Sequence, residues 1–487
     1  MFQVTFIGHQ GWLFRTASTT VLLDPLLTER FGHGGHLGLV YPPRIVRPEA
    51  FPPVDAVVLS HEHDDHFDIP SLERLDRRIP IHLSARSSRA SHALLQQMGF
   101  SVFPLVPQAL LAVGDLRLLP FVADHRATPN SDEWDVLPFV LWDTQGHGSV
   151  VSSIDVRMPQ SLLDRLPQLV PRPGIWCHAN NSTSVAFQNL GGPCLVDEDD
   201  TPRLAKVVLA RHARLARAWG RPVATLVGGG GWSFGGDRAW IDHHAFPFES
   251  ERLCESLRTL QPDDSFIAPG PGYTLTLEHG RVVSQSERCA FIEPAPRDQW
   301  PSRARALAAD PPRDYAPACG RRRLEAGERE RLVAELEDYA RYLYGSALHR
   351  ALYSLPAVLE GRSASWGLSL RDDGGDFCVR HDPTGCRFVD GGSEDPQHAL
   401  ASGIEGWGTD LLAFLTGEIG ATALCYSGRL RVWNHVPERL RVTPHDLWMY
   451  AHPLRRPAVT EALYRRLLAA EPRAVARVRS RSDEPEV

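Results

Sequence analysis

The sequence predicts an α/β protein in two parts: an αββα sandwich over residues 1–292 and a smaller α+β domain over residues 324–487. Three observations carry this prediction. Short apolar strand patterns alternate with helix patterns in the first part. Residues 293–323 are rich in Pro and Arg and lose apolar periodicity, which is typical of a linker. The full length of 487 residues also exceeds one ordinary core.

The first part contains short runs of apolar and β-branched residues, which favour strands. These strand patterns cover residues 4–8, 20–24, 56–60 and 221–229. Longer runs with helical spacing of apolar residues cover residues 71–78 and 203–220. This order fits two sheets stacked between two layers of helices.

The second part begins with one long predicted helix over residues 328–355. Its apolar stripe faces a core or a dimer partner, and contains Leu332, Leu336, Tyr339, Leu343 and Tyr344. Strand patterns follow at residues 363–373, 375–382 and 386–392, then a helix at 407–419 and a strand at 425–435. The order is loosely similar to a sterol-carrier-like module, and the role of this domain is open.

A dense group of metal-ligating residue types follows the apolar run at residues 54–59. The sequence SHEHDDHFD arranges His61, His63, Asp65 and His66 as H-x-H-x-D-H. Two imidazoles two residues apart can converge on one divalent metal, while the Asp and the second His turn toward another. The group lies where a buried strand ends, the edge at which open α/β folds place their chemistry. A two-metal site is therefore predicted.

Such a site needs partners from elsewhere in the chain. His125 and Asp155 each follow a strand-like run, which suggests loops at the same edge of a sheet. Farther along stand His243 and His244, adjacent residues that cannot easily serve the same metal. One of the pair is expected to ligate, with His244 preferred and His243 as the alternative. Ordinary loop or helix-start histidines are the competing interpretation for His125 and for this pair.

The opening of the chain adds an independent signal. Residues 6–27, FIGHQGWLFRTASTTVLLDPLL, resemble the "GH … DP" start of one branch of the metallo-β-lactamase fold superfamily. That branch includes L-ascorbate-6-phosphate lactonase, N-acylphosphatidylethanolamine phospholipase D and CMP-N-acetylneuraminate hydroxylase. The H-x-H-x-D-H motif is highly specific for the superfamily, and the resemblance covers about the first 290 residues.

This resemblance implies two divalent metal ions, with zinc preferred and manganese or iron as alternatives. The implied ligands are His61, His63 and His125 for the first metal, Asp65, His66 and His244 or His243 for the second, and Asp155 as the bridge. The chain departs from the pattern at the bridge, where many relatives have Gly-Asp-Thr and this sequence reads Ser153-Ile154-Asp155-Val156. The carboxylate is retained, while the loop around it differs.

The ligand set implies a hydrolase acting on a phosphoester, lactone or amide of a small molecule. A water shared by two divalent cations loses a proton near neutral pH, and Asp65 is the candidate catalytic residue that orients this nucleophile. A di-iron oxygenase, which would need an electron donor protein, is the first alternative. A non-catalytic metal-binding or carrier protein is the second.

Two further segments are candidates for contact with the substrate. The polar stretch after Asp155 contains Trp176, His178 and Asn180, which otherwise serve as capping and turn residues. The glycine-rich residues 227–236 either contact substrate near the metals or simply allow tight backbone packing. The substrate itself is not specified by any of these residues.

Composition excludes several other classes. The net charge of −7 argues against a general nucleic-acid binder, and no apolar run approaches the length of a membrane span. The eight cysteines are scattered without a CxxC motif, which fits reduced thiols, and the N-terminus lacks a signal-peptide pattern. A cytoplasmic enzyme is expected, and homo-oligomerisation stays open.

Overall fold

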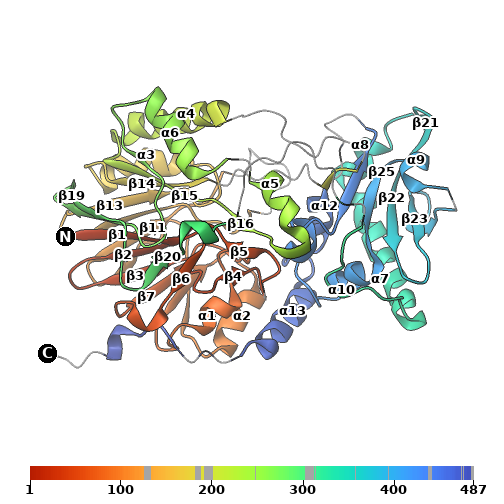
Figure 1. Ribbon diagram of the computed structural model, residues 1–487, viewed down its shortest axis with the longest axis horizontal. Helices are drawn as coiled ribbons and strands as arrows, with labels where there is room; N and C mark the ends of the chain where they lie inside the picture. The colour runs from red at the N-terminus through yellow and green to blue at the C-terminus, as the bar shows by residue number, and fades with distance from the viewer. Residues whose placement is uncertain are drawn as a thin grey trace.

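The computed structural model confirms an αββα sandwich in the N-terminal part, with further sheets and helices in the C-terminal region (Figure 1). It describes residues 1–33, 35–124, 133–180, 188–190, 201–246, 248–301, 312, 314–356, 358–392, 394–436, 441, 443–472, 474 and 476–483.

The first sheet has eight strands and carries the start of the chain. Its order is β19 (Arg281–Ser286), β18 (Thr274–Glu278), β1 (Phe2–Gly8), β2 (Gly11–Arg15), β3 (Thr20–Leu23), β7 (Ala56–Leu59), β8 (Ile81–Ser84) and β9 (Val102–Leu105). Strand β7 pairs in parallel with both β3 and β8, so the loop after β7 leaves from an interior position of the sheet.

The second sheet has seven strands and stacks on the first. Its order is β10 (Leu111–Val113), β11 (Leu116–Pro120), β12 (Phe139–Asp143), β13 (Ser149–Ser152), β14 (Ile175–Asn180), β15 (Ala224–Gly229) and β17 (Phe266–Ile267). One buried cluster joins the two sheets, with Phe6 and Trp12 from the first and Leu118 and Phe139 from the second. Alternate strand residues point into this shared core.

Helices cover both outer faces of the sandwich. Apolar residues of α1 (Ile69–Glu73) and α2 (Arg89–Gln97) pack on the first sheet. Those of α3 (Gln160–Leu169), α4 (Thr201–Trp219) and α6 (Ser250–Leu260) pack on the second. Helix α1 is shorter than predicted because the chain turns after Glu73 and Leu75 bridges to Val478.

Smaller elements complete the N-terminal part. They are β4 (Arg30–Phe31), β5 (Gly38–Val40), β6 (Arg44–Val46), β16 (Trp232–Ser233), β20 (Ile292–Pro294), α5 (Asp242–Ala245), and the 3-10 helices η1 (Pro48–Ala50), η4 (Gly236–Ile241) and η5 (Arg297–Gln299). A separate buried cluster contains apolar residues of β4, β5, β16, η4 and α5, among them Phe31 and Trp232, together with Phe246.

The C-terminal region is built on a mixed sheet with its own core. The sheet contains β21 (Val358–Leu359), β22 (Arg362–Arg371), β23 (Phe377–Asp382), β24 (Arg387–Asp390), β25 (Leu400–Trp407) and β26 (Arg431–Asn434). Its helices are α7 (Ala326–Gly345), α8 (Ala347–Leu352), α9 (Pro396–Ala399), α10 (Gly408–Leu415), α11 (Thr422–Cys425), α12 (Pro444–Tyr450) and α13 (Pro457–Ala470). Within the described residues, no helix combines the length and apolarity needed to span a membrane.

The last part of the chain returns to the N-terminal sandwich. Helix α13 packs beside α2 (Figure 1), and Tyr464 and Val478 are buried in the core under the first sheet. Ser480 forms a bridge to Val54, just before the 3-10 helix η7 (Arg481–Asp483). The division at residues 292/293 and 323/324 stays a prediction.

Candidate metal centre

The H-x-H-x-D-H segment forms a tight loop between β7 and α1. The backbone N–H groups of His66 and Phe67 both donate to the carbonyl of His63, at 2.9 and 2.6 Å. The side chain of Asp68 then accepts from the Ser71 N–H and caps α1. Because the turn is this tight, the side chains of Asp65 and His66 lie close to that of His61.

The structure brings together five of the predicted ligands. Ligand atoms of His61, His63 and Asp65 lie within 4.8 Å of one another, and so do those of His61, His66 and Asp155. Asp155 comes from the loop directly after β13, as its place behind a strand-like run predicted. Two overlapping groups that share His61 are the arrangement expected of two neighbouring metal positions.

Asp155 faces both imidazoles with one oxygen. Its Oδ2 lies 2.8 Å from His66 Nε2 and 3.5 Å from His61 Nε2. Both Nε2 atoms are buried and face this carboxylate. Two imidazole nitrogens that converge on one carboxylate oxygen fit the chemistry of metal ligands. The donor set suits zinc, manganese or iron.

Asp24, from the LLDP segment of the opening, fixes the orientation of two of these imidazoles. Its Oδ2 accepts from His66 Nδ1 at 2.9 Å, and its carboxylate accepts from the Ser60 N–H at 2.8 Å and the Ser60 hydroxyl at 2.7 Å. Since that hydroxyl proton goes to Asp24, His61 Nδ1–H donates to Ser60 Oγ at 2.8 Å. The network leaves Nε2 of His61 unprotonated toward the cluster, the tautomer that a metal requires.

His9, from the Gly-His of the opening, contacts the same cluster. Its Nε2 lies 3.0 Å from Asp65 Oδ2, and His9, Asp65 and His66 form a third group of close ligand atoms. His9, Asp24 and Ile154 all have positive φ values, of 53°, 41° and 51°. Such conformations are strained for residues other than glycine and concentrate at functional sites.

The electrostatics of the two central imidazoles differ. Burial lowers the pKa of His61 well below its usual range, and the neighbouring His66 lowers it further, so its ring is neutral. For His66, burial also acts to lower the pKa, but Asp155 and Asp65 hold it well above the usual range. Burial alone would raise the pKa of Asp65, yet His66 and His9 keep it well below the ordinary value. Metal binding at His66 would therefore release a proton.

Three other predicted ligands are not added to this cluster. His125 lies outside the described residues, as does the side chain of His243. His244 is buried in α5, with its ring centroid 6.0 Å from that of Trp240. It belongs to none of the three groups found among the described residues. The last ligand of the second metal therefore stays a prediction.

The predicted substrate contacts lie on β14 and have different environments. Trp176 packs in the core between the second sheet and its helices. The Asn180 amide donates to the Phe248 carbonyl at 2.8 Å and to Ser250 Oγ at 3.1 Å, which gives it a structural role. His178 lines a cavity of about 270 Å³ that adjoins Asp155. Burial, followed by the nearby Arg211, lowers the pKa of His178 to about 3.

The glycine-rich loop packs tightly. A Cβ on Gly231 would lie 2.3 Å from a ring carbon of Phe246, and the Gly229 N–H donates to the His9 carbonyl at 2.6 Å. The glycines therefore serve close backbone approach behind the cluster.

Contacts from the C-terminal region reach the metal-binding loop, which sequence reasoning did not anticipate. The hydroxyl of Thr422 in α11 donates to buried Asp64, between the predicted ligands His63 and Asp65. The ring of Trp448 in α12 lies 5.2 Å from that of His63. No local pattern could signal the first contact, because it joins residues 358 positions apart.

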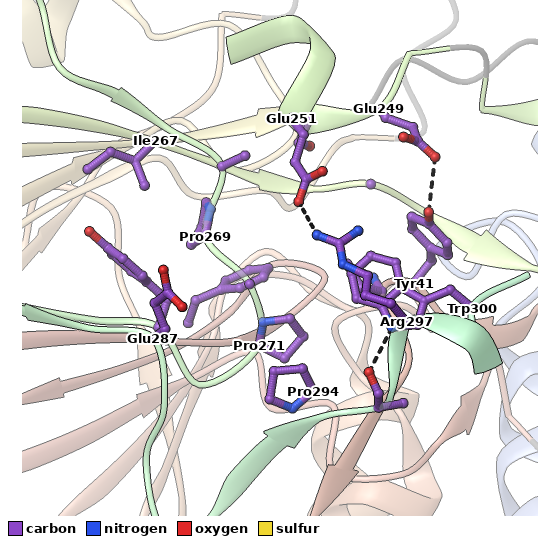
Figure 2. A pocket seen from close by; sticks show the side chains of 18 of the residues that line it. Tyr41, Glu249, Glu251, Ile267, Pro269, Pro271, Glu287, Pro294, Arg297 and Trp300 are labelled. Atoms are coloured by element: carbon purple, nitrogen blue, oxygen red, sulfur yellow. Dashed lines mark hydrogen bonds and ion pairs between the residues drawn. The ribbon is translucent and has the colours of Figure 1, made fainter. Parts of the chain in front are cut away.

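A larger cavity lies elsewhere. It has a volume of about 1010 Å³, and none of the clustered ligands lines it. Figure 2 shows two pairs among its polar groups: the Tyr41 hydroxyl donates to Glu249, and Arg297 pairs with Glu251. Size alone therefore does not make it the chemical site.

Comparisons with known proteins support the fold. Residues 19–152 match the family model described as the beta-lactamase superfamily domain. A stretch of 74 residues is 38% identical to an uncharacterized protein of Mycobacterium tuberculosis, covering 15% of this chain and 20% of that protein. The matched stretch thus spans about a fifth of the length of these curated relatives.

Solved structures of low identity also align with this chain. An isothiocyanate hydrolase from Delia radicum gut bacteria aligns at 15% identity and a TM-score of 0.40, covering 57% of this chain and 99% of that one. CmlA, a diiron beta-hydroxylase from Streptomyces venezuelae, aligns at 15% identity and a TM-score of 0.36, covering 57% and 54%. With the family match and the two stacked sheets, the N-terminal part is a metallo-β-lactamase-like α/β fold that carries a beta-lactamase superfamily domain.

Proposed function

We propose that the protein is a binuclear metal-dependent hydrolase. The observation that carries this proposal is the meeting of His61 Nε2 and His66 Nε2 at one carboxylate oxygen of Asp155. The proposed ligands are His61, His63 and His125 for one ion, Asp65, His66 and His244 for the other, with Asp155 between them. The GH…DP opening supports placing the chain in the lactonase and phospholipase branch, because its His9 and Asp24 both contact the cluster.

Two divalent ions at this site would supply Lewis acidity and an acidified water as the nucleophile. The chain itself supplies orientation. Asp24 holds the ring of His66 and, through Ser60, that of His61. The low pKa of Asp65 keeps its carboxylate ionised, so it can accept a hydrogen bond from a reacting water and orient it.

The cavity beside Asp155 supports a small substrate that carries negative charge. It holds about 270 Å³ and is lined by His178 and Arg211 as well as by Asp155. At neutral pH the ring of His178 is uncharged, which leaves Arg211 as the cation that faces the substrate. A phosphoester fits this lining best, followed by a lactone or amide with an acidic group.

Metal analysis combined with turnover tests this proposal. We expect about two zinc or manganese ions per chain by plasma mass spectrometry, together with hydrolysis in a panel of phosphoesters, lactones and amides. Asp155→Ala should lose paired metal and activity, whereas Asp164→Ala, which removes a carboxylate from the exposed side of α3, should keep both. Metal-replete protein that is inert across the panel would contradict the hydrolase and favour a non-catalytic metal-binding role.

A di-iron oxygenase is the second candidate. The observation that favours it is the carboxylate-rich setting of His66, with Asp24 and Asp155 at 2.9 and 2.8 Å. Imidazole and carboxylate ligands together suit iron as well as zinc. Two irons per chain and reductant-dependent oxygen uptake would establish this activity, and full hydrolytic activity of iron-free protein would exclude it.

The cysteines support the proposed cytoplasmic location. Those in the described part of the chain are all free thiols, several of them buried. Free buried thiols fit a reducing compartment.

A further inference from the structure

A second cavity lies where the N-terminal part meets the C-terminal region. It has a volume of about 240 Å³ and shares no lining residue with the metal cluster. Its walls come from η4, from residues 314–321 and from the turn at residues 427–429. The walls are in close contact, because a Cβ on Gly428 would lie 2.8 Å from the Ile241 side chain.

Three arginines from distant parts of the sequence line this cavity: Arg238, Arg321 and Arg429. Arg238 donates to the His36 carbonyl at 3.1 Å, and Arg429 donates to the Ala423 carbonyl at 3.3 Å. Backbone carbonyls orient these two guanidinium groups without neutralising their charge. Burial lowers the pKa of Arg238 to about 10, and the positive charge of Arg429 contributes to that lowering.

Several aspartates offset part of this charge. Asp314 pairs with Arg321 at 2.6 Å, and both side chains of that pair are largely exposed. Asp237 also lines the cavity and interacts with the charges of Arg238 and Arg429. Outside the lining, Asp410 interacts with Arg429 and Asp242 interacts with Arg238. Among the lining groups alone, three arginines and two aspartates leave one net positive charge.

Two residues that line the cavity carry buried donors without partners. The Tyr315 hydroxyl and the Arg429 Nε–H have no hydrogen-bond partner among the described residues. Tyr315 is only 9% exposed, and the guanidinium carbons of Arg371 and Arg431 lie 4.7 and 4.4 Å from its ring centroid. Burial, followed by the charge of Glu405, raises the pKa of this phenol, so it keeps a proton to donate. Such unsatisfied donors are costly unless a ligand accepts from them.

We propose that this cavity is a binding site for a phosphate group, held by Arg238, Arg429 and the Tyr315 hydroxyl. A phosphate offers several acceptor oxygens and a charge that guanidinium groups recognise well. The cavity volume of about 240 Å³ equals that of roughly eight waters, so the phosphate can belong to a small phosphomonoester.

The position of the site suggests what a bound phosphate does. It would join Arg238 of η4 to Arg429 of the C-terminal region and to Tyr315 in residues 314–321. Helix η4 runs directly into α5, which carries His244. Binding would therefore hold the two regions together and steady the segment that holds a predicted metal ligand. The phosphate site does not depend on the proposed hydrolase activity.

Calorimetric titration of the full chain with inorganic phosphate and with glycerol 3-phosphate tests the site. Tyr315→Phe removes only the hydroxyl, and Arg429→Gln removes charge and donors. We expect each variant to bind about tenfold more weakly or worse. Arg331→Gln, which removes an exposed arginine from α7, is the matched control and should bind like the unchanged protein. Tighter binding of glycerol 3-phosphate would identify a phosphomonoester as the natural ligand, and equal binding would identify free phosphate.

The metal centre could itself bind phosphate, so Asp155→Ala separates the two sites. Phosphate should bind Asp155→Ala with unchanged affinity at this cavity, and should bind Tyr315→Phe and Arg429→Gln about tenfold more weakly or worse, with a correspondingly smaller rise in melting temperature. The proposal is overturned if phosphate binding disappears only in Asp155→Ala, if both cavity variants bind normally, or if acetate binds more tightly than phosphate. Failure of the hydrolase panel would leave this result unaffected.

Discussion

Asp24 shows how a single residue connects the opening of the chain to the metal-binding loop. Its carboxylate accepts from Ser60 and from His66, and it is completely buried. The positive φ of Asp24, 41°, aims the side chain back toward the end of β7. The sequence identified the LLDP segment as a motif, but the role of its aspartate depends on the parallel pairing of β3 with β7.

We expect Asp24→Asn to weaken metal binding by about 10- to 100-fold, because residues that orient a ligating histidine typically contribute this much. The amide keeps the shape but loses the charge that holds His66 Nδ1–H. Competition titration with a fluorescent zinc chelator measures the effect. Asp115→Asn makes the same change of charge at a carboxylate away from the cluster, where it accepts from the Thr16 hydroxyl, and should bind metal normally. Unchanged affinity in Asp24→Asn would show that the network does not support the site.

His178 predicts a specific dependence of stability on pH. Its pKa is lowered to about 3 in the folded protein by burial and Arg211, against 6.5 when unfolded. As the pH falls below 6.5, the unfolded chain binds a proton at His178 while the folded protein does not. Protonation therefore favours the unfolded chain, and the free energy of unfolding falls between pH 6.5 and 3. Between pH 7 and 5, the free energy of unfolding should fall by about 2 kcal/mol more in the unchanged protein than in His178→Gln.

Urea unfolding followed by tryptophan fluorescence is suited to this comparison, since the Trp176 ring lies 4.7 Å from His178. Parallel stability curves for the two proteins would show that His178 is protonated in the folded state or exposed to solvent.

At the scale of elements, each strand range predicted from the sequence corresponds to an observed strand, but many other strands were not predicted. Predicted strands at 363–373, 375–382 and 386–392 correspond to β22, β23 and β24. The predicted helix at 328–355 is instead two helices, because Ser346 ends α7 and caps α8 by accepting from the His349 N–H. Strand β25 was missed. Its Gly403 is crowded by Trp433 and the Gly367 carbonyl, so packing rather than strand propensity explains this residue.

The cluster around β7 was predictable for a different reason. His61, His63, Asp65 and His66 lie within six residues, so one loop brings them together whatever the distant contacts are. Asp155 was found because it directly follows a strand. Asp24, Thr422 and Trp448 reach the loop only through tertiary packing, for which a single sequence carries no local signal.

The contact between α11 and the metal-binding loop gives a prediction at this scale. Thr422→Val keeps the side-chain shape but removes the donor to buried Asp64, which should lower the free energy of unfolding by about 1–3 kcal/mol. Thr460→Val is the control. Thr460 and Thr422 line one small cavity of about 80 Å³, and the Thr460 hydroxyl makes only a 3.5 Å contact with the Arg456 carbonyl. Equal stability of the two variants in chemical denaturation would show that the Asp64 contact adds little.

At the scale of the whole molecule, the end of the chain ties the C-terminal region to the sandwich. Helix α13 contacts α2, and the segment at 478–480 bridges to Leu75 and Val54. Arg481 also pairs with Asp55 at 3.0 Å, next to the start of β7. These contacts surround the strand that delivers the metal-binding loop. The C-terminal segment thus packs on the sandwich, while the boundaries at residues 292/293 and 323/324 stay a prediction.

Removing the last segment tests this view of the molecule. A chain ending at residue 456 loses α13 and the segment at 478–480 that bridges to Leu75 and Val54. The buried Tyr464 and Val478 are lost with them. Because each large buried apolar side chain contributes about 1.5–3 kcal/mol, we expect the free energy of unfolding of the sandwich to fall by at least about 3 kcal/mol. The matched control ends at residue 483 and keeps every one of these contacts. Hydrogen exchange of the β7 and β8 amides locates the loss, since local opening should accelerate exchange there more than in β12 and β13. If the shorter chain keeps the same exchange rates and the same metal content, the sandwich folds without residues 457–487, and this view of the molecule is wrong.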